Sequence, residues 1–235
     1  AVLAIDPSSP FSGGAILGDR VRMGDHTLDP GVFIRSMATR GHLGGLALAT
    51  PSAIRVLDAV GFPWVVVETV GVGQVEVEVV GSADTTVVVV NPGWGDAVQA
   101  NKAGLMEIAD VFVINKADRA GAGETGQDLR QMRAMRISDG WDPPVVSTVA
   151  HDGTGVADLW AAVAAHRSWL TETGELEVRR RRRSGDELRG IVAALLEARA
   201  STVARGEAFE VARTEVWERR VDPWTAAEGL LGDAD

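Results

Sequence analysis

The tetrapeptide Asn115-Lys116-Ala117-Asp118 directly follows an apolar run at residues 111–114. A carboxylate such as that of Asp118 accepts both adjacent N–H donors on one edge of guanine, and adenine lacks this pair of donors. An unpaired aspartate opposite adenine makes such a site strongly selective between the two bases. We expect Asn115 to tie the loop together and the stem of Lys116 to pack on the base face. The pattern predicts a guanine site; the alternative is a helix cap with Asp118 exposed.

Carboxylates close two further apolar runs. Glu68 ends the run at residues 64–68, and Gly71 follows three residues later, as in the Walker B region of nucleotide hydrolases. There the acid orders Mg²⁺ or its water, and the glycine lets a backbone N–H approach the γ-phosphate. Asp6 ends the run at residues 2–5, and Asp19 lies thirteen residues beyond it. Carboxylates at one edge of the sheet suit Mg²⁺, which prefers oxygen ligands. Taken alone, Asp6 or Asp19 is more often a turn former, and the alternative for Glu68 is a turn cap.

The elements that position these residues are short Val- and Ile-rich runs alternating with helical patterns. This alternation indicates βαβ units and a parallel α/β sheet, with strands buried on both faces. The predicted strands are 2–5, 64–68, 85–90, 111–115 and 144–147, and the predicted helices are 51–61, 97–109, 125–137 and 156–170. Residues 75–79 alternate at period two, which leaves a strand or a helical turn open.

Strand signals stop near residue 171, and the remaining chain is charged and helical. We therefore predict a main domain at 1–171 and a helical extension at 172–235. Between residues 186 and 199, Leu188, Ile191, Leu195 and Leu196 fall on one helix side and need a partner, either the main domain or a second copy. Asp222-Pro223 opens a last helix, with proline at its first position.

Composition narrows the function classes. The 235 residues carry a net charge of −10, which argues against nucleic-acid binding. The absence of cysteine removes disulfides and thiolate metal sites. No apolar run reaches the roughly 18 residues of a membrane helix, so a cytoplasmic protein is expected. The five arginines at residues 179–183 are interpreted as a solvated helix segment or as a grip for an anionic partner.

Five segments together resemble the MeaB/ArgK family, GTPases that assist adenosylcobalamin-dependent acyl-CoA mutases such as methylmalonyl-CoA mutase. They are Asp6-Pro7-Ser8-Ser9, Gly13-Gly14-Ala15-Ile16-Leu17-Gly18-Asp19, Arg35-Ser36-Met37-Ala38-Thr39-Arg40-Gly41, Glu68-Thr69-Val70-Gly71-Val72-Gly73-Gln74 and Asn115-Lys116-Ala117-Asp118. The resemblance runs without a gap to about residue 170. It implies a P-loop NTPase-type three-layer α/β fold, GTP or GDP with Mg²⁺ as ligands, and a chaperone role in loading, gating and protecting the mutase cofactor.

The resemblance also implies individual roles. Asp19 corresponds to the Mg²⁺ ligand, and Asp6 and Glu68 correspond to carboxylates that order the metal's waters or the attacking water. Residues 91–102 correspond to a mobile segment that signals to the mutase, and the extension to a dimerisation region. The candidate contacts in that segment are Asp96, Gln99 and Lys102. Arg22 and Lys102 are candidates for transition-state charge, since Val72 stands where switch GTPases carry glutamine.

Two departures from the family accompany the resemblance. Both lysines, Lys102 and Lys116, follow asparagine, so the sequence holds no Gly-Lys-Ser or Gly-Lys-Thr loop for the phosphates. We expect that loop upstream of Asp6 in a longer protein, and GTP hydrolysis by the full-length protein. Val149-Ala150 stands in place of a Ser-Ala loop, where only the backbone N–H of Ala150 is needed.

Three other functions compete with this interpretation. The first is an ATP-dependent kinase or ATPase linked to lysine, arginine and ornithine transport. Asp118 argues against it, because adenine lacks the pair of N–H donors that this carboxylate would bind. A nickel-chaperone GTPase usually needs Cys or His clusters for metal transfer. An interaction module without a nucleotide site is the third alternative, and the sequence upstream of Ala1 decides it.

Overall fold

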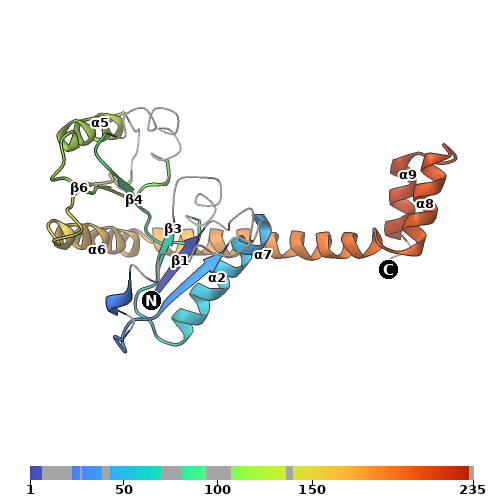
Figure 1. Cartoon of the computed structure of the whole chain (residues 1–235), viewed down its shortest axis with the longest axis horizontal. Coiled ribbons are helices and arrows are strands. Elements are labelled where there is room, and N and C mark those ends of the chain that lie inside the picture. The colour runs from blue at the N-terminus through green and yellow to red at the C-terminus, as the bar shows by residue number, and fades with distance from the viewer. Residues whose placement is uncertain are drawn as a thin grey trace. The chain divides into compact units, whose positions relative to one another are not determined.

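The computed structural model in Figure 1 describes residues 1–6, 23–26, 28–38, 43–69, 81–93, 107–135 and 140–232. This part of the chain contains six strands with helices between some of them, in line with the βαβ pattern that the sequence predicted. Several predicted site residues lie outside the described ranges: Asp19, Arg22, Gly71, Asp96, Gln99 and Lys102. The backbone of Asp6 is described, and its side chain is not.

The strands form two parallel three-stranded sheets. The first has the order β2-β1-β3, with β1 at Val2–Asp6, β2 at Ile34–Ala38 and β3 at Val66–Thr69. The second has the order β4-β5-β6, with β4 at Val87–Val90, β5 at Val111–Ile114 and β6 at Val145–Ser147. All four ladders are parallel, which confirms the predicted α/β class.

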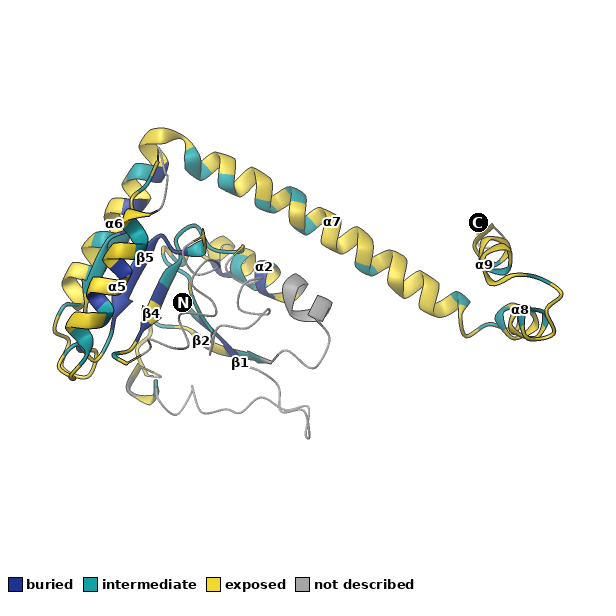
Figure 2. Ribbon diagram, turned by 90° about the horizontal axis from the view of Figure 1, so that it is seen from above, coloured by how far each residue is buried: buried dark blue, intermediate teal, exposed yellow. Residues whose placement is uncertain are grey.

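The second sheet is the middle of three layers. Phe112 and Ile114 of β5 pack in one core cluster with Leu129 of α5, which spans Ala122–Ala134. Successive side chains of a strand point to opposite faces, so Val111 and Val113 face the other way. Both are buried, and helix α6 (Val156–Thr173) is the other helix that contacts β5. Figure 2 shows β5 fully buried, as its continuous apolar run predicted.

Two elements of the first sheet differ from the prediction. Strand β2 was not predicted, because its sequence lacks a continuous apolar run. Among the described strands it pairs only with β1, and it carries the exposed Arg35. Helix α2 (Leu43–Ala59) begins eight residues before the predicted start and contains Pro51. Proline usually begins a helix or breaks one. Here Thr50 and Leu57, two turns apart, are both buried, so packing holds both halves of the helix in place.

The carboxyl-terminal part is helical, as predicted, with α7 at Glu175–Val203, α8 at Glu207–Trp217 and α9 at Pro223–Gly232. The chain divides into two compact units, Ala1–Ser184 and Gly185–Asp235. Within the second unit α8 packs against α9. Asp222 caps α9 by accepting the backbone N–H groups of Trp224 and Thr225 at 3.0 and 3.1 Å. None of the described helices combines the length and apolar composition that a bilayer crossing requires.

Candidate functional site

Asn115 links the ends of three strands in the second sheet. It directly follows β5, and its backbone N–H donates to Val90 O, at the end of β4, at 2.9 Å. Its side-chain Oδ1 accepts the backbone N–H of Ala150 at 3.1 Å and the hydroxyl of Thr148 at 3.3 Å. Both partners belong to the loop that follows β6. A single amide oxygen therefore joins the loops after β5 and β6 at one edge of the sheet.

The next residue, Lys116, has a left-handed backbone with φ of 57°. Non-glycine residues adopt this conformation rarely, and it is often found at functional sites. Hydrogen bonds hold the strained turn: Ala117 N–H donates to Thr148 O at 3.0 Å, and Arg119 N–H donates to Lys116 O at 3.0 Å. The turn leaves Lys116 and Asp118 exposed at the carboxyl end of β5, where a ligand can reach both side chains.

The loop after β6 is shaped by local contacts. Val149 N–H donates to Thr154 O at 2.9 Å, and Asp152 Oδ1 accepts Thr154 N–H at 2.9 Å. That backbone hydrogen bond from Thr154 lowers the pKa of the Asp152 carboxyl. Gly155 has φ of 76°, and a Cβ atom there would lie 2.1 Å from Ser147 O. Only glycine fits this close approach, so the loop that presents Ala150 depends on it.

The predicted role of Ala150 meets a competing contact. Its backbone N–H, the one group of Ala150 that the predicted base-supporting loop needs, already donates to Asn115 Oδ1. A bound base has to share this donor or displace Asn115 as its acceptor. Thr148 was missed in the sequence. It is a buried residue, and the available signal was a hydroxyl residue at the carboxyl end of a predicted strand.

Glu68 lies in β3, one residue before the strand ends, and pairs in register with Ala4. Its Oε2 atom is buried and has no hydrogen-bond partner among the described residues. Asp6 ends β1 opposite Ala38. A carboxylate oxygen without a partner suits a hard cation or a water bound to one. The described ranges contain no group of three or more potential metal ligands, so Glu68 is the described contribution to such a site.

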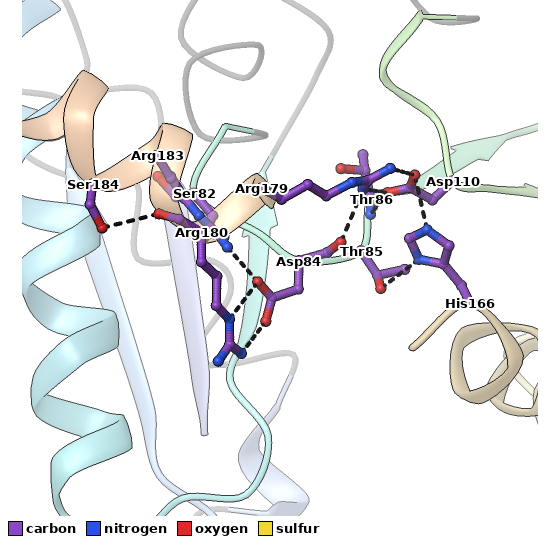
Figure 3. Close-up of polar contacts among 10 residues, drawn as sticks. All are labelled: Ser82, Asp84, Thr85, Thr86, Asp110, His166, Arg179, Arg180, Arg183 and Ser184. Atoms are coloured by element: carbon purple, nitrogen blue, oxygen red, sulfur yellow. Dashed lines mark hydrogen bonds and ion pairs between the residues drawn. The ribbon is translucent and has the colours of Figure 1, made fainter. Parts of the chain in front are cut away.

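At the opposite edge of the second sheet, three arginines of α7 bind two aspartates; Figure 3 shows this arginine clamp. Arg179 donates to both carboxylate oxygens of Asp110 at 3.0 and 3.1 Å. Arg180 lies 2.6 Å from Asp84, and Arg183 also pairs with Asp84. Three of the five arginines at 179–183 therefore hold carboxylates of their own chain, which is neither of the two uses predicted for them.

The charges of the clamp reinforce each other. Burial by itself raises the pKa of Asp84, but the hydrogen bonds from Arg180 and Arg183 outweigh it, so this pKa is lowered. The hydrogen bond to Asp84 raises the pKa of Arg180. Asp84 and Asp110 precede β4 and β5, whereas Asn115 follows β5. The clamp therefore lies away from the candidate site and anchors the start of α7 to this sheet.

A hydroxyl, an imidazole and a carboxylate also meet at the clamp. Thr85 Oγ1 lies 2.8 Å from His166 Nδ1, and His166 Nε2 lies 3.3 Å from Asp110 Oδ1 without forming a hydrogen bond. The set does not suit nucleophilic catalysis, because Asp110 is occupied by Arg179 and by Thr86 N–H at 2.8 Å. His166 is fully buried, and burial lowers its pKa.

Comparison with known proteins identifies the family. The sequence model described as methylmalonyl Co-A mutase-associated GTPase MeaB matches residues 1–205 of the 235. The chain belongs to the MeaB family of GTPases. This confirms the resemblance that the sequence motifs predicted. In this MeaB-family chain the matched range contains both sheets, the Asn115 loop and all of α7.

Individual relatives agree with the MeaB assignment. A protein of Pyrococcus abyssi named as a GTPase is 52% identical over 235 residues, covering 98% of this chain and 72% of the relative. GTPase ArgK of Escherichia coli is 38% identical over 198 residues, covering 80% of this chain and 59% of the relative. The crystal structure of a LAO/AO transport system kinase has a TM-score of 0.65 and 25% identity, covering 98% of this chain and 70% of that one.

Proposed function

We propose that this chain supplies the guanine-binding and metal-ordering parts of a protein that binds and hydrolyses GTP. The observation that carries the proposal is the Asn115 loop, in which one amide joins two loops beside the exposed Asp118. The Asp118 carboxylate accepts the two edge N–H groups of guanine. The stem of Lys116 covers the base face, and the N–H of Ala150 donates to the guanine oxygen.

Hydrolysis needs only positioning and charge stabilisation from the protein. Mg²⁺, when bound, neutralises charge on the β- and γ-phosphate oxygens. Asp19 would hold this ion, and Asp6 and Glu68 would order its waters or the attacking water. Gly71 brings a backbone N–H close to the γ-phosphate. The water attacks the γ-phosphorus in line while the bond from that phosphorus to the β–γ bridging oxygen breaks, so GDP and inorganic phosphate leave and no covalent intermediate forms. The unpartnered oxygen of Glu68 supports its role, because a buried carboxylate oxygen needs a hydrogen-bond donor or a cation.

The phosphates require a Gly-Lys-Ser or Gly-Lys-Thr loop, which we place on a strand outside this sequence. Among the described strands, β3 pairs only with β1 and β4 pairs only with β5. Each therefore has an edge at which one more parallel strand can pair. A strand between β3 and β4 would join the two sheets and end at the same edge as Glu68 and Asn115.

The family description supports an acyl-CoA mutase as the partner of the proposed GTPase. A relative in Mus musculus, 36% identical and covered over 45% of its length, is named methylmalonic aciduria type A homolog, mitochondrial. We assign the signal to the mutase to residues 91–102, with Asp96, Gln99 and Lys102 as contacts. Arg22 and Lys102 supply transition-state charge in the complex. The protein acts in the cytoplasm, without nucleic acid or membrane.

A homodimer through the helical extension completes the proposal. Leu188, Ile191 and Leu195 recur at three- and four-residue spacing along α7, so they share one side of the helix. Leu188 and Leu195 are 64% and 66% exposed in the single chain. An apolar stripe of this kind is stable when a second helix covers it. Sedimentation velocity tests this assignment, which a monomer at tens of micromolar would contradict.

The guanine assignment is tested on the full-length protein by titration with GTP and ATP. Asp118→Ala removes two hydrogen bonds to a charged group, each contributing about 1.5–3 kcal/mol, so GTP binding should weaken by roughly 100-fold or more. The binding of ATP should not change. Asp128→Ala, at an exposed position on α5, is the matched control and should leave both affinities unchanged.

Competition also separates the GTPase from the alternative of an ATP-dependent transport kinase; the structural relative is described as a LAO/AO transport system kinase. A GTPase prefers GTP, and Asp118→Ala removes that preference. If the wild-type protein binds ATP as tightly as GTP, or if the substitution leaves the base preference unchanged, the proposed guanine site is wrong.

A further inference from the structure

Ser36 and Glu68 lie in one row across the first sheet. In the β1–β2 ladder Ala4 pairs with Ser36, and in the β1–β3 ladder Ala4 pairs with Glu68. Residues in register on adjacent strands present their side chains to the same face. The two outer residues of this row therefore share a face, and only the methyl group of Ala4 stands between them.

Both ends of this row carry a buried polar atom that lacks a partner. Ser36 Oγ and Glu68 Oε2 are each buried without a hydrogen bond among the described residues, and Ala4 between them is fully buried. Leaving a buried polar group unsatisfied is costly, by about 1–3 kcal/mol for a neutral group and more for a charged one. Two such groups in one row therefore call for a common partner.

The spacing of the strands sets what that partner is. Adjacent strands lie about 4.8 Å apart, so the Cα atoms of Ser36 and Glu68 are about 10 Å apart. The small side chain of Ala4 leaves space above the sheet between them. One water, donating to Glu68 Oε2 and accepting from the hydroxyl, gives both groups a partner, and buried waters typically have two to four polar partners. The other acceptor sites of the carboxylate stay available to the metal's waters or the attacking water.

We propose that Ser36 is a positioning residue that holds the Glu68 carboxylate through one shared buried water. This inference rests on the proposed function, in which Glu68 orders the metal's waters or the attacking water. The hydroxyl restricts Glu68 to one orientation before the nucleotide arrives. A serine at this point of β2 is otherwise a poor choice, because serine buries a hydroxyl that an alanine would not.

The test uses four forms of the full-length protein: wild type, Ser36→Ala, Glu68→Ala and the double variant. The kcat of GTP hydrolysis and the Kd of GTP are measured for each. A misplacement of about 1 Å costs roughly 100-fold in rate, so Ser36→Ala should lower kcat by about tenfold to 100-fold. It should leave the Kd of GTP within about twofold. In the Glu68→Ala background the same change should have no further effect.

Two variants control for structural damage. Ser36→Thr keeps the hydroxyl and should retain most of kcat, and Ser168→Ala, at an exposed position of α6, should behave as wild type. A crystal structure should show a water within hydrogen-bond distance of Ser36 Oγ and Glu68 Oε2, and this readout does not depend on turnover.

The outcomes separate the two proposals. The positioning role is wrong if Ser36→Ala lowers kcat by the same factor in the wild-type and in the Glu68→Ala background. It is also wrong if Glu68→Ala abolishes turnover while Ser36→Ala leaves kcat unchanged. If Glu68→Ala itself leaves kcat unchanged, the assigned role of Glu68 in the proposed function fails, and the positioning role that rests on it fails too. In that case the crystal structure still decides whether the water contact exists.

Discussion

Removing the Asp110 carboxylate should take away the acceptor that a guanidinium and a backbone N–H share in the arginine clamp. The Asp110 side chain is only 9% exposed, and the Arg179 side chain is 28% exposed. Asp110 accepts two hydrogen bonds from Arg179, at 3.0 and 3.1 Å, and one from Thr86 N–H at 2.8 Å. Asp110→Ala therefore removes the carboxylate partner of a largely buried guanidinium and of a backbone donor at the same time.

The expected loss follows from these contacts. Breaking a buried ion pair by removing one partner typically costs about 3–5 kcal/mol, because the other charge stays buried without compensation. The guanidinium of Arg179 also donates to Asp84 O at 3.2 Å, which offsets part of the loss. We therefore expect Asp110→Ala to lower the free energy of unfolding by about 3 kcal/mol.

Urea denaturation followed by tryptophan fluorescence measures this loss. Trp141 is a local reporter, because its indole N–H donates to Asp110 O at 2.7 Å. Asp186→Ala is the matched control: Asp186 pairs with Arg189 three residues away, and their side chains are 58% and 75% exposed. Exposed pairs contribute about 0–1 kcal/mol. Equal losses from Asp110→Ala and Asp186→Ala would refute the reasoning that burial makes the clamp strong.

Two further predictions concern pH and the site loop. Burial lowers the pKa of the His166 imidazole in the folded protein. As the pH falls below about 6.5, the imidazole is therefore protonated in the unfolded chain before it is protonated in the folded protein. The free energy of unfolding decreases between about pH 6.5 and the lowered pKa of the folded state. In urea titrations at pH 7 and 5.5, His166→Asn should reduce the loss of stability; an unchanged loss would contradict the assignment. Gly155→Ala forces a Cβ to within 2.1 Å of Ser147 O at a φ of 76°, so it should destabilise the protein by more than about 2 kcal/mol. The control is Gly153→Ala, because Gly153 has a φ of 81° but no atom within 4 Å of the added Cβ. It should lower the free energy of unfolding by only about 1–2 kcal/mol. Equal losses for the two variants in thermal or urea unfolding would show that the close contact at Gly155 has no effect.

The two sheets differ in how well the sequence predicted them. Strand β5 was predicted nearly to the residue, because both its faces are buried and its sequence is a continuous apolar run. Strand β2 was missed because it is partly exposed, and its Arg35 and Ser36 interrupt the apolar pattern. The early start of α2 was missed for a related reason: Pro51 reads locally as a helix start, and only packing allows the helix to continue through it.

The candidate site divides in the same way. The tetrapeptide from Asn115 to Asp118 was recognised from residue types alone, and the family comparison confirmed the identification as a GTPase. The partners of Asn115 were not predictable, because Thr148 and Ala150 lie more than thirty residues further along the chain. Their contact exists only because β5 and β6 are neighbours in the sheet.

By itself, the sequence determined the parallel α/β class and the family, because these depend on residue types and on short-range periodicity; it also predicted the guanine site at Asn115–Asp118. The tertiary structure alone decided which charges meet. The arginines of residues 179–183 looked free or partner-directed in the sequence, yet three of them bind Asp84 and Asp110, roughly 70 to 100 residues earlier. Long-range ion pairs and register-dependent rows, such as Ser36, Ala4 and Glu68, leave no local pattern because they arise only when distant strands come into contact.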